Sequence, residues 1–164
     1  MRPFRARGEE VVARFDPAEA GVLGLLLDQL EQLLDADSVA EDPVLRRLFP
    51  DGHRGDPEVA ADYRDMTEES LRSGKADDLA TMRASLPPTG GEVRLDRELA
   101  GAWLRTTNDI RLALGVRLDI TEDTEPPEDP AAEGDGQQLA VYYWLTAVQG
   151  SLVDALAAGR AGRR

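Results

Sequence analysis

The stretch DRELAGAWLRTTNDIRLALGVRL, residues 96–118, decides the fold because it has the pattern of one long helix. Asp96 has a side chain typical of an N-cap, and apolar positions follow at spacings of three and four residues. The residues that form this predicted core face are Leu99, Trp103, Thr106, Ile110 and Leu114. The opposite side carries Leu104, Asn108 and Leu112 at i, i+4 and i+8. A helix that is apolar on both sides must be covered on both, inside a bundle or by a second subunit.

Asn108, the only asparagine of the chain, lies between the two leucines of this second seam. Three interpretations fit: a bundle helix whose amide bonds a backbone carbonyl, a homodimer seam whose register the amide sets, or a ligand contact. The dimer seam would use Leu104, Asn108 and Leu112. Next to it, Arg105 and Asp109 are spaced i, i+4, which predicts a solvated surface pair, and Arg111 extends the polar edge.

The rest of the chain predicts a mostly α, single-domain helical bundle over residues 1–164 with a small N-terminal β-element. Residues 2–15 read as a β-hairpin, 17–119 as the helical core, 120–136 as an acidic mobile loop and 137–158 as a C-terminal helix. Residues 92–95 form a candidate third strand that pairs with the hairpin. Asp-Pro pairs at residues 16, 42 and 56 predict helix starts, and the Thr-Glu-Glu-Ser stretch from Thr67 predicts a further N-cap.

Composition excludes several classes of function. The 164 residues contain 32 acidic and 19 basic side chains, a net charge of −13, which disfavours general binding to nucleic acid or to anionic membranes. The absence of cysteine excludes disulfides and thiolate chemistry, and the single histidine, His53, excludes a His-rich metal centre. The N-terminus lacks the apolar segment of a signal peptide, so we expect a cytoplasmic protein.

No motif indicates catalysis. No carboxylate pair is isolated on an apolar face, the acidic loop lacks the ligand pattern of an EF-hand, and no glycine-rich phosphate loop or nucleophile elbow is present. We therefore expect no enzyme and no cofactor.

Positive charge gathers at the ends of the chain. Arg2, Arg5 and Arg7 precede the first acidic residue, and three further arginines lie within residues 160–164. If the ends meet, these side chains form a basic spot on an acidic body, able to contact an acidic protein surface or nucleic acid held by a partner. The alternative is that they are solubilising ends.

Several segments resemble one actinobacterial family, known as domain of unknown function 2017. The similar stretches in the first half lie within residues 42–50 and 63–71. Those in the second half are Trp103-Leu104, Asn108-Asp109-Ile110-Arg111-Leu112-Ala113-Leu114-Gly115 with Arg117-Leu118, and Tyr143-Trp144-Leu145-Thr146 with Gln149 and Leu152-Val153.

This resemblance implies a small regulator, because some members are described as AosR-like oxidative-stress transcriptional regulators. They act through a sigma factor, with a cysteine pair as redox switch, and that switch cannot operate in these 164 residues. We therefore expect a non-enzymatic protein that contacts a sigma factor or RNA polymerase and binds DNA weakly or not at all. The alternative is an accessory or adaptor of the ClpS/Clp proteolysis system, because genes of the family tend to neighbour that of ClpS.

Overall fold

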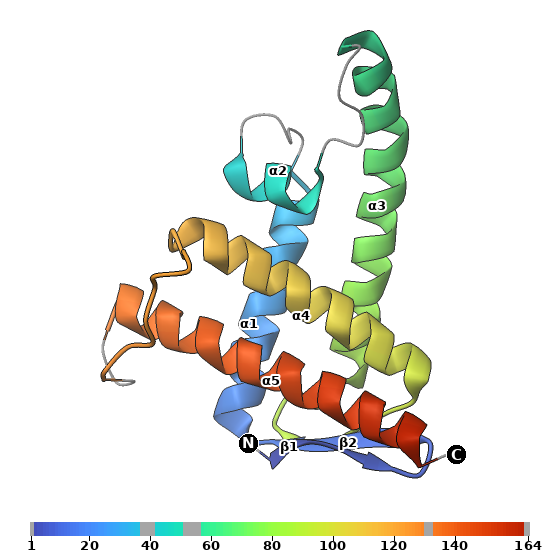
Figure 1. Ribbon diagram of the computed structural model, residues 1–164, viewed down its shortest axis with the longest axis vertical. Coiled ribbons are helices and arrows are strands. Elements are labelled where there is room, and N and C mark those ends of the chain that lie inside the picture. Colours follow the sequence, from blue (N-terminus) through green and yellow to red (C-terminus); the bar gives the residue numbers. More distant parts are fainter. Residues whose placement is uncertain (1, 37–41, 51–56, 130–132, 163–164) are drawn as a thin grey trace.

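A computed structural model describes residues 2–36, 42–50, 57–129 and 133–162, with residue 2 and residues 57–66 described as backbone only. Within these ranges the chain forms three strands and five helices (Figure 1). This confirms the prediction of a mostly α fold with a small antiparallel sheet. The turn predicted around His53 and the cap predicted at Asp56 lie outside the described residues.

The sheet contains both strands of the predicted hairpin and the predicted third strand. Strands β1 (Arg2–Arg7), β2 (Glu10–Phe15) and β3 (Gly91–Leu95) are antiparallel in the order β1-β2-β3. Gly90 makes this arrangement possible, because a Cβ on it would lie 2.7 Å from the backbone carbon of Asp16 and its φ is +81°. Only glycine adopts this close approach without strain.

Aspartate caps begin three of the helices as predicted. They are α1 (Pro17–Leu34), α2 (Pro43–Leu48) and α4 (Arg97–Arg117). The side chain of Asp16 accepts a hydrogen bond from the backbone N–H of Glu19, and the Glu19 carboxylate accepts one from the N–H of Asp16 in return. Such a capping box satisfies two backbone donors that the first turn leaves without helical partners.

The predicted helix start at Thr67 is wrong, because α3 runs without a break from Pro57 to Ser85. The Thr-Glu-Glu-Ser stretch contains no proline, and its Glu68 finds a partner within a continuous helix. Arg72 pairs with Glu68 one turn earlier at 3.1 Å, donates to the backbone carbonyl of Leu34 and lies over the ring of Phe49 at 5.0 Å. These contacts tie the middle of α3 to α1 and to the end of α2.

The last helix, α5 (Asp135–Ala161), is longer than predicted by two residues at its start and three at its end. It lies along β1, and its C-terminal turns and the sheet occupy the same end of the molecule (Figure 1). The backbone N–H of Phe4 donates to the Ser151 hydroxyl at 3.3 Å, so α5 engages a backbone donor of the edge strand β1.

Four aromatic rings connect the sheet with α4 and α5. The fully buried Trp103 ring stacks on Phe15 at 5.9 Å and meets Phe4 edge-on at 5.8 Å, and Phe15 also contacts Trp144. The indole N–H donates to the Ser85 hydroxyl at 2.7 Å. Apart from Phe49 and Met82, the other buried hydrophobic residues among those described are aliphatic. No helix among the described residues is long and apolar enough to cross a membrane.

Candidate functional site

Helix α4 lies between α3 and α5 and carries most of the candidate residues (Figure 1). Its predicted core face is confirmed at Trp103, Thr106, Ile110 and Leu114, which are all buried, while Leu99 is half-buried. The other sides of α4 carry the polar side chains of the family-like stretch that begins at Asn108, and these side chains make different contacts.

Arg111 joins α4 to α5. Its Nε donates to Thr146 Oγ1 at 3.0 Å, one of its terminal nitrogens donates to Gln149 Oε1 at 2.5 Å, and its guanidinium lies 5.4 Å from the centre of the Tyr142 ring. Arg111 belongs to the family-like motif that begins at Asn108, and Thr146 and Gln149 belong to the family-like motif that begins at Tyr143. The two motifs therefore meet in space through one side chain, a contact that no local pattern in the sequence indicates.

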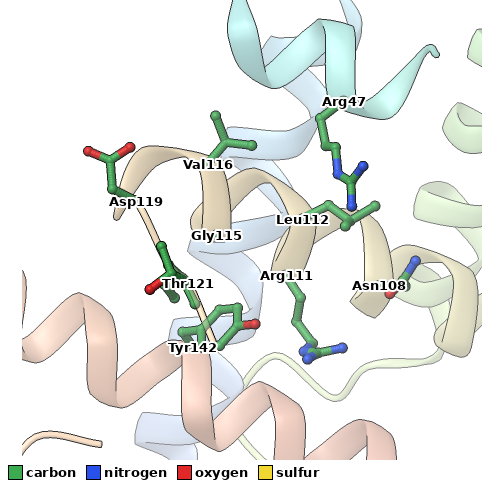
Figure 2. A pocket seen from close by; sticks show the side chains of 10 residues that line it. Arg47, Asn108, Arg111, Leu112, Gly115, Val116, Asp119, Thr121 and Tyr142 are labelled. Carbon is green, nitrogen blue, oxygen red and sulfur yellow. The ribbon is translucent and has the colours of Figure 1, made fainter. Parts of the chain in front are cut away.

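A hollow of about 460 Å³ opens beside this contact, between α2, α4, α5 and the segment that follows α4. Its lining residues are Arg47, Asn108, Arg111, Leu112, Gly115, Val116, Asp119, Ile120, Thr121 and Tyr142. Figure 2 shows Arg47 reaching from α2 towards Leu112, while Arg111 points away from α2 towards α5. At the rim, Asp119 has a φ of +50°, a left-handed conformation that usually belongs to glycine at the end of a helix.

The predicted second seam of α4 is divided between two hollows. Leu112 lines the hollow of Figure 2, and Leu104 lines another of about 630 Å³ near the β1–β2 turn and the end of α5. Both leucines are half-buried and pack against the core, and Asn108 between them is half-buried as well. Part of the seam is thus covered within one chain. The homodimer through Leu104, Asn108 and Leu112 stays a prediction.

The predicted surface pair of Arg105 with Asp109 is wrong. Arg105 instead forms a two-pronged ion pair with Asp78 of α3, at 2.7 and 2.9 Å, and Asp109 is buried and accepts from Lys75 Nζ at 2.8 Å. The spacing i, i+4 permits a pair within α4, but α3 supplies oppositely charged partners for both side chains. Lys75 is the only lysine of the chain, and nothing in its sequence surroundings marked it as the partner of Asp109.

Burial governs the charge state of Asp109. Desolvation raises the pKa of the Asp109 carboxyl above its ordinary value, the hydrogen bond and charge of Lys75 lower it by less, and the nearby Asp78 charge adds to the rise. The Asp78 carboxylate also raises the pKa of Arg105, chiefly through their hydrogen bond. The α3–α4 contact is therefore held by four charged groups that influence one another.

A second candidate site is the outer sheet face, the side of the sheet that points away from the core. It contains Arg5, Arg7, Glu10, Val12, Arg14, Glu92 and Arg94. Arg5, Val12 and Arg94 form one row across the three strands, because Val12 is the register partner of both arginines. The face has four arginines and two glutamates, a net charge of +2 on a chain of −13.

Three of these arginines carry no ion pair within the described part of the chain. Arg94 pairs with Glu92 at 2.7 Å and with Glu10 at 3.5 Å, and the hydrogen bond to Glu92 is the main cause of its raised pKa. Both glutamates are thereby engaged, whereas Arg5, Arg7 and Arg14 are exposed and free. They surround a hollow of about 420 Å³ on this face.

The basic spot predicted at the chain ends stays a prediction, and two of its arginines belong to the outer sheet face. Arg5 and Arg7 lie on it, and the end of α5 comes within reach of β1, because a Cβ on Gly159 would lie 3.9 Å from Ala6. The side chain of Arg2 and residues 163–164 lie outside the described part. The sequence analysis missed Arg14 and Arg94. The two-residue alternation of the strands could have identified them, since both occupy outward positions.

The residues described contain no group of three or more His, Asp or Glu side chains placed to hold a metal ion. The charges of α4 and of the outer sheet face are arranged as ion pairs and as free cations. The ion pairs of α4 are satisfied within the chain, so of the two arrangements the free cations of the sheet face are the charges left to contact another molecule.

Comparison with known proteins places the chain in a family without an assigned function. Residues 1–156 match the family model described as domain of unknown function (DUF2017), and the chain belongs to this family. It is 30% identical over 167 aligned residues to the oxidative stress regulator AosR of Mycobacterium tuberculosis and to that of Mycobacterium bovis, covering 86% of this chain and 76% of each relative.

A protein of Mycobacterium leprae that carries the AosR name is 37% identical over 131 residues. This alignment covers 72% of the chain but only 60% of the length of that relative. No solved structure gives a significant match. The family membership confirms the resemblance on which the sequence analysis relied.

Proposed function

We propose that this protein is a non-enzymatic regulator associated with transcription, which acts in the cytoplasm by contact with a sigma factor or RNA polymerase during oxidative stress. The observation that carries the proposal is its 30–37% identity, over most of the chain, to relatives named as oxidative stress regulators. The free arginines of the outer sheet face and the hollow beside Arg111 supply surfaces for a partner.

These 164 residues supply no thiol with which to sense an oxidant. None of the 164 is cysteine, so neither a disulfide nor a sulfenic acid forms within them. The proposal therefore separates two properties, the contact with a partner and the detection of oxidant, and assigns only the first to this chain.

The test is capture of partners by the tagged full chain from lysate of the native host at moderate salt, read by mass spectrometry. Enrichment of a sigma factor or RNA polymerase, reproduced with the purified component, is the expected result. The tag alone is the control. Enrichment of Clp components without transcription proteins would overturn the proposal in favour of the adaptor hypothesis.

The homodimer is a separate proposal that uses the second seam of α4. Leu104→Glu places a charge at one end of this seam, and we expect a dimeric solution mass to fall to that of the 17.9 kDa monomer. Light scattering at several concentrations measures it, with circular dichroism to verify folding. A folded variant of unchanged mass would exclude this seam as the interface.

A further inference from the structure

The outer sheet face has the properties of a docking surface for one kind of ligand. We propose that it binds an extended acidic segment of a partner protein, with Arg5, Arg7 and Arg14 pairing the carboxylates. This inference rests on the proposed function, because it names the chemistry by which such a regulator recognises a protein.

The spacing of the three free arginines matches an extended peptide. Arg5 and Arg7 are two residues apart on β1, which places their Cα atoms about 7 Å from each other. Arg14 lies two residues along β2 from Val12, the register partner of Arg5, so Arg5 and Arg14 are diagonal neighbours about 7–8 Å apart. Carboxylates at alternate positions of an extended chain have nearly the same separation, about 7 Å.

Val12 gives the face an apolar centre. It is half-buried on the middle strand and lies between Arg5 and Arg94, so side-chain carbon of a peptide has a surface to cover. Docking across the face is favoured over strand addition at β1, because the Phe4 N–H of that edge is already bonded to Ser151 of α5.

The ends of the sheet disfavour nucleic acid as the ligand. Glu9 and Asp96 lie at one end, after β1 and β3, and Asp16 lies at the other, and all three are exposed. Strands of six residues span only about 20 Å, whereas a duplex carries a charge every 1.7 Å along its whole length. A long polyanion would therefore extend beyond the arginines and meet carboxylates, while a short acidic segment ends on the face.

The test is a binding titration of the full chain with a fluorescein-labelled dodecapeptide of alternating Glu and Thr, followed by anisotropy. Arg5→Gln/Arg14→Gln removes two of the free charges, and Gln is chosen because Glu at position 14 would oppose Glu92 across the strands. We expect about tenfold weaker binding by this variant, and weaker binding by the wild type as salt rises.

The matched control is Arg46→Gln/Arg117→Gln, two exposed arginines on α2 and at the C-terminal end of α4, which changes the net charge equally away from the sheet (Figure 1). It should alter peptide binding less than twofold. Equal weakening by both variants, no binding of the peptide up to about 1 mM, or tighter binding of a 12-base-pair duplex than of the peptide would each overturn the proposal. A solution mass that rises with concentration in the wild type and in the control, but not in Arg5→Gln/Arg14→Gln, would also overturn the proposal. A second copy of the chain would then occupy the face.

The two proposals fail separately. Capture of transcription proteins by the wild type and equally by Arg5→Gln/Arg14→Gln would leave the proposed function standing and overturn the docking face. Peptide binding that depends on these arginines, without capture of transcription proteins, would leave the docking face standing and overturn the proposed function.

Discussion

Helix α4 contacts the rest of the molecule through two faces of opposite chemistry. One face places Trp103 and Ile110 in the apolar core, and the other connects Arg105 and Asp109 to α3 through ion pairs. Apolar burial stabilises in proportion to area, whereas an ion pair must first offset the desolvation of both charges. We therefore expect the apolar face to hold most of the stability and the charged face to define how α3 aligns with α4.

The largest expected effect is that of removing the Trp103 ring. Trp103→Ala deletes a fully buried indole that contacts two phenylalanine rings, so we expect a loss of about 3–5 kcal/mol in the free energy of unfolding. Urea denaturation followed by circular dichroism measures it. Trp103→Phe, which keeps an aromatic ring, should lose less than half as much. A loss below about 1 kcal/mol for the alanine variant would contradict a core centred on this ring.

Breaking the Lys75–Asp109 pair is expected to have the next largest effect. Lys75→Met leaves the buried Asp109 carboxylate without its cation, which should cost about 2 kcal/mol at pH 7. The double variant Lys75→Met/Asp109→Leu removes both charges and should recover most of that loss. If the double variant were no more stable than the single one, the cost would come from lost packing of the lysine stem.

The Asp109 carboxyl should also make the stability of the protein depend on pH, with a sign opposite to that of a carboxyl whose pKa folding lowers. Its pKa is raised in the folded state, so the folded chain holds this proton more tightly than the unfolded chain. The contribution of Asp109 to stability should therefore fall as pH rises from its ordinary value of 3.8 through the raised value. The difference in unfolding free energy between wild type and Asp109→Asn, measured between pH 3.5 and 7, isolates it. A difference that grew in favour of wild type with rising pH would mean that attraction to Lys75 exceeds the cost of burial.

The same comparison explains which features could be predicted from sequence. Local rules of periodicity and capping predicted the core face of α4, the Asp16 and Asp96 caps and the strands. These predictions were confirmed. The prediction for Asp109 was wrong because its partner lies 34 residues upstream on α3. The packing of α3 against α4 has to be known before this pair can be predicted. Of the outer sheet face, the sequence analysis named only Arg5 and Arg7, as members of a basic spot at the chain ends, since Arg94 joins the face through the β2–β3 register.

Thr106 is the one polar member of the core face of α4, and its replacement should stabilise the protein. Its Oγ1 is buried and has no hydrogen-bond partner among the described residues. Thr106→Val exchanges this hydroxyl for a methyl group of the same shape, so we expect a gain of about 1 kcal/mol in thermal or urea denaturation. Thr106→Ser, which keeps the hydroxyl and loses the methyl, should lose stability. A loss in the valine variant would show that the hydroxyl does find a partner.

The smallest expected effect is that of removing Arg105. Its ion pair with Asp78 has two hydrogen bonds, whereas the Lys75–Asp109 pair has one, but Arg105 is far more exposed to solvent. Its side chain is 63% exposed, so water and salt screen its two hydrogen bonds to Asp78. Arg105→Gln should therefore cost only about 0.5 kcal/mol, and the difference should vanish in 1 M salt.

Arg105 also acts on the buried pair through Asp78, whose charge raises the pKa of Asp109. Without Arg105, the Asp78 charge is uncompensated, and the carboxyl carbon of Asp109 should titrate at higher pH in an NMR experiment. Arg97→Gln, an exposed arginine at the start of α4, is the control for the loss of one charge. If Arg105→Gln cost as much stability as Lys75→Met, exposure would not separate the two ion pairs, and the charged face would stabilise α4 as a single network.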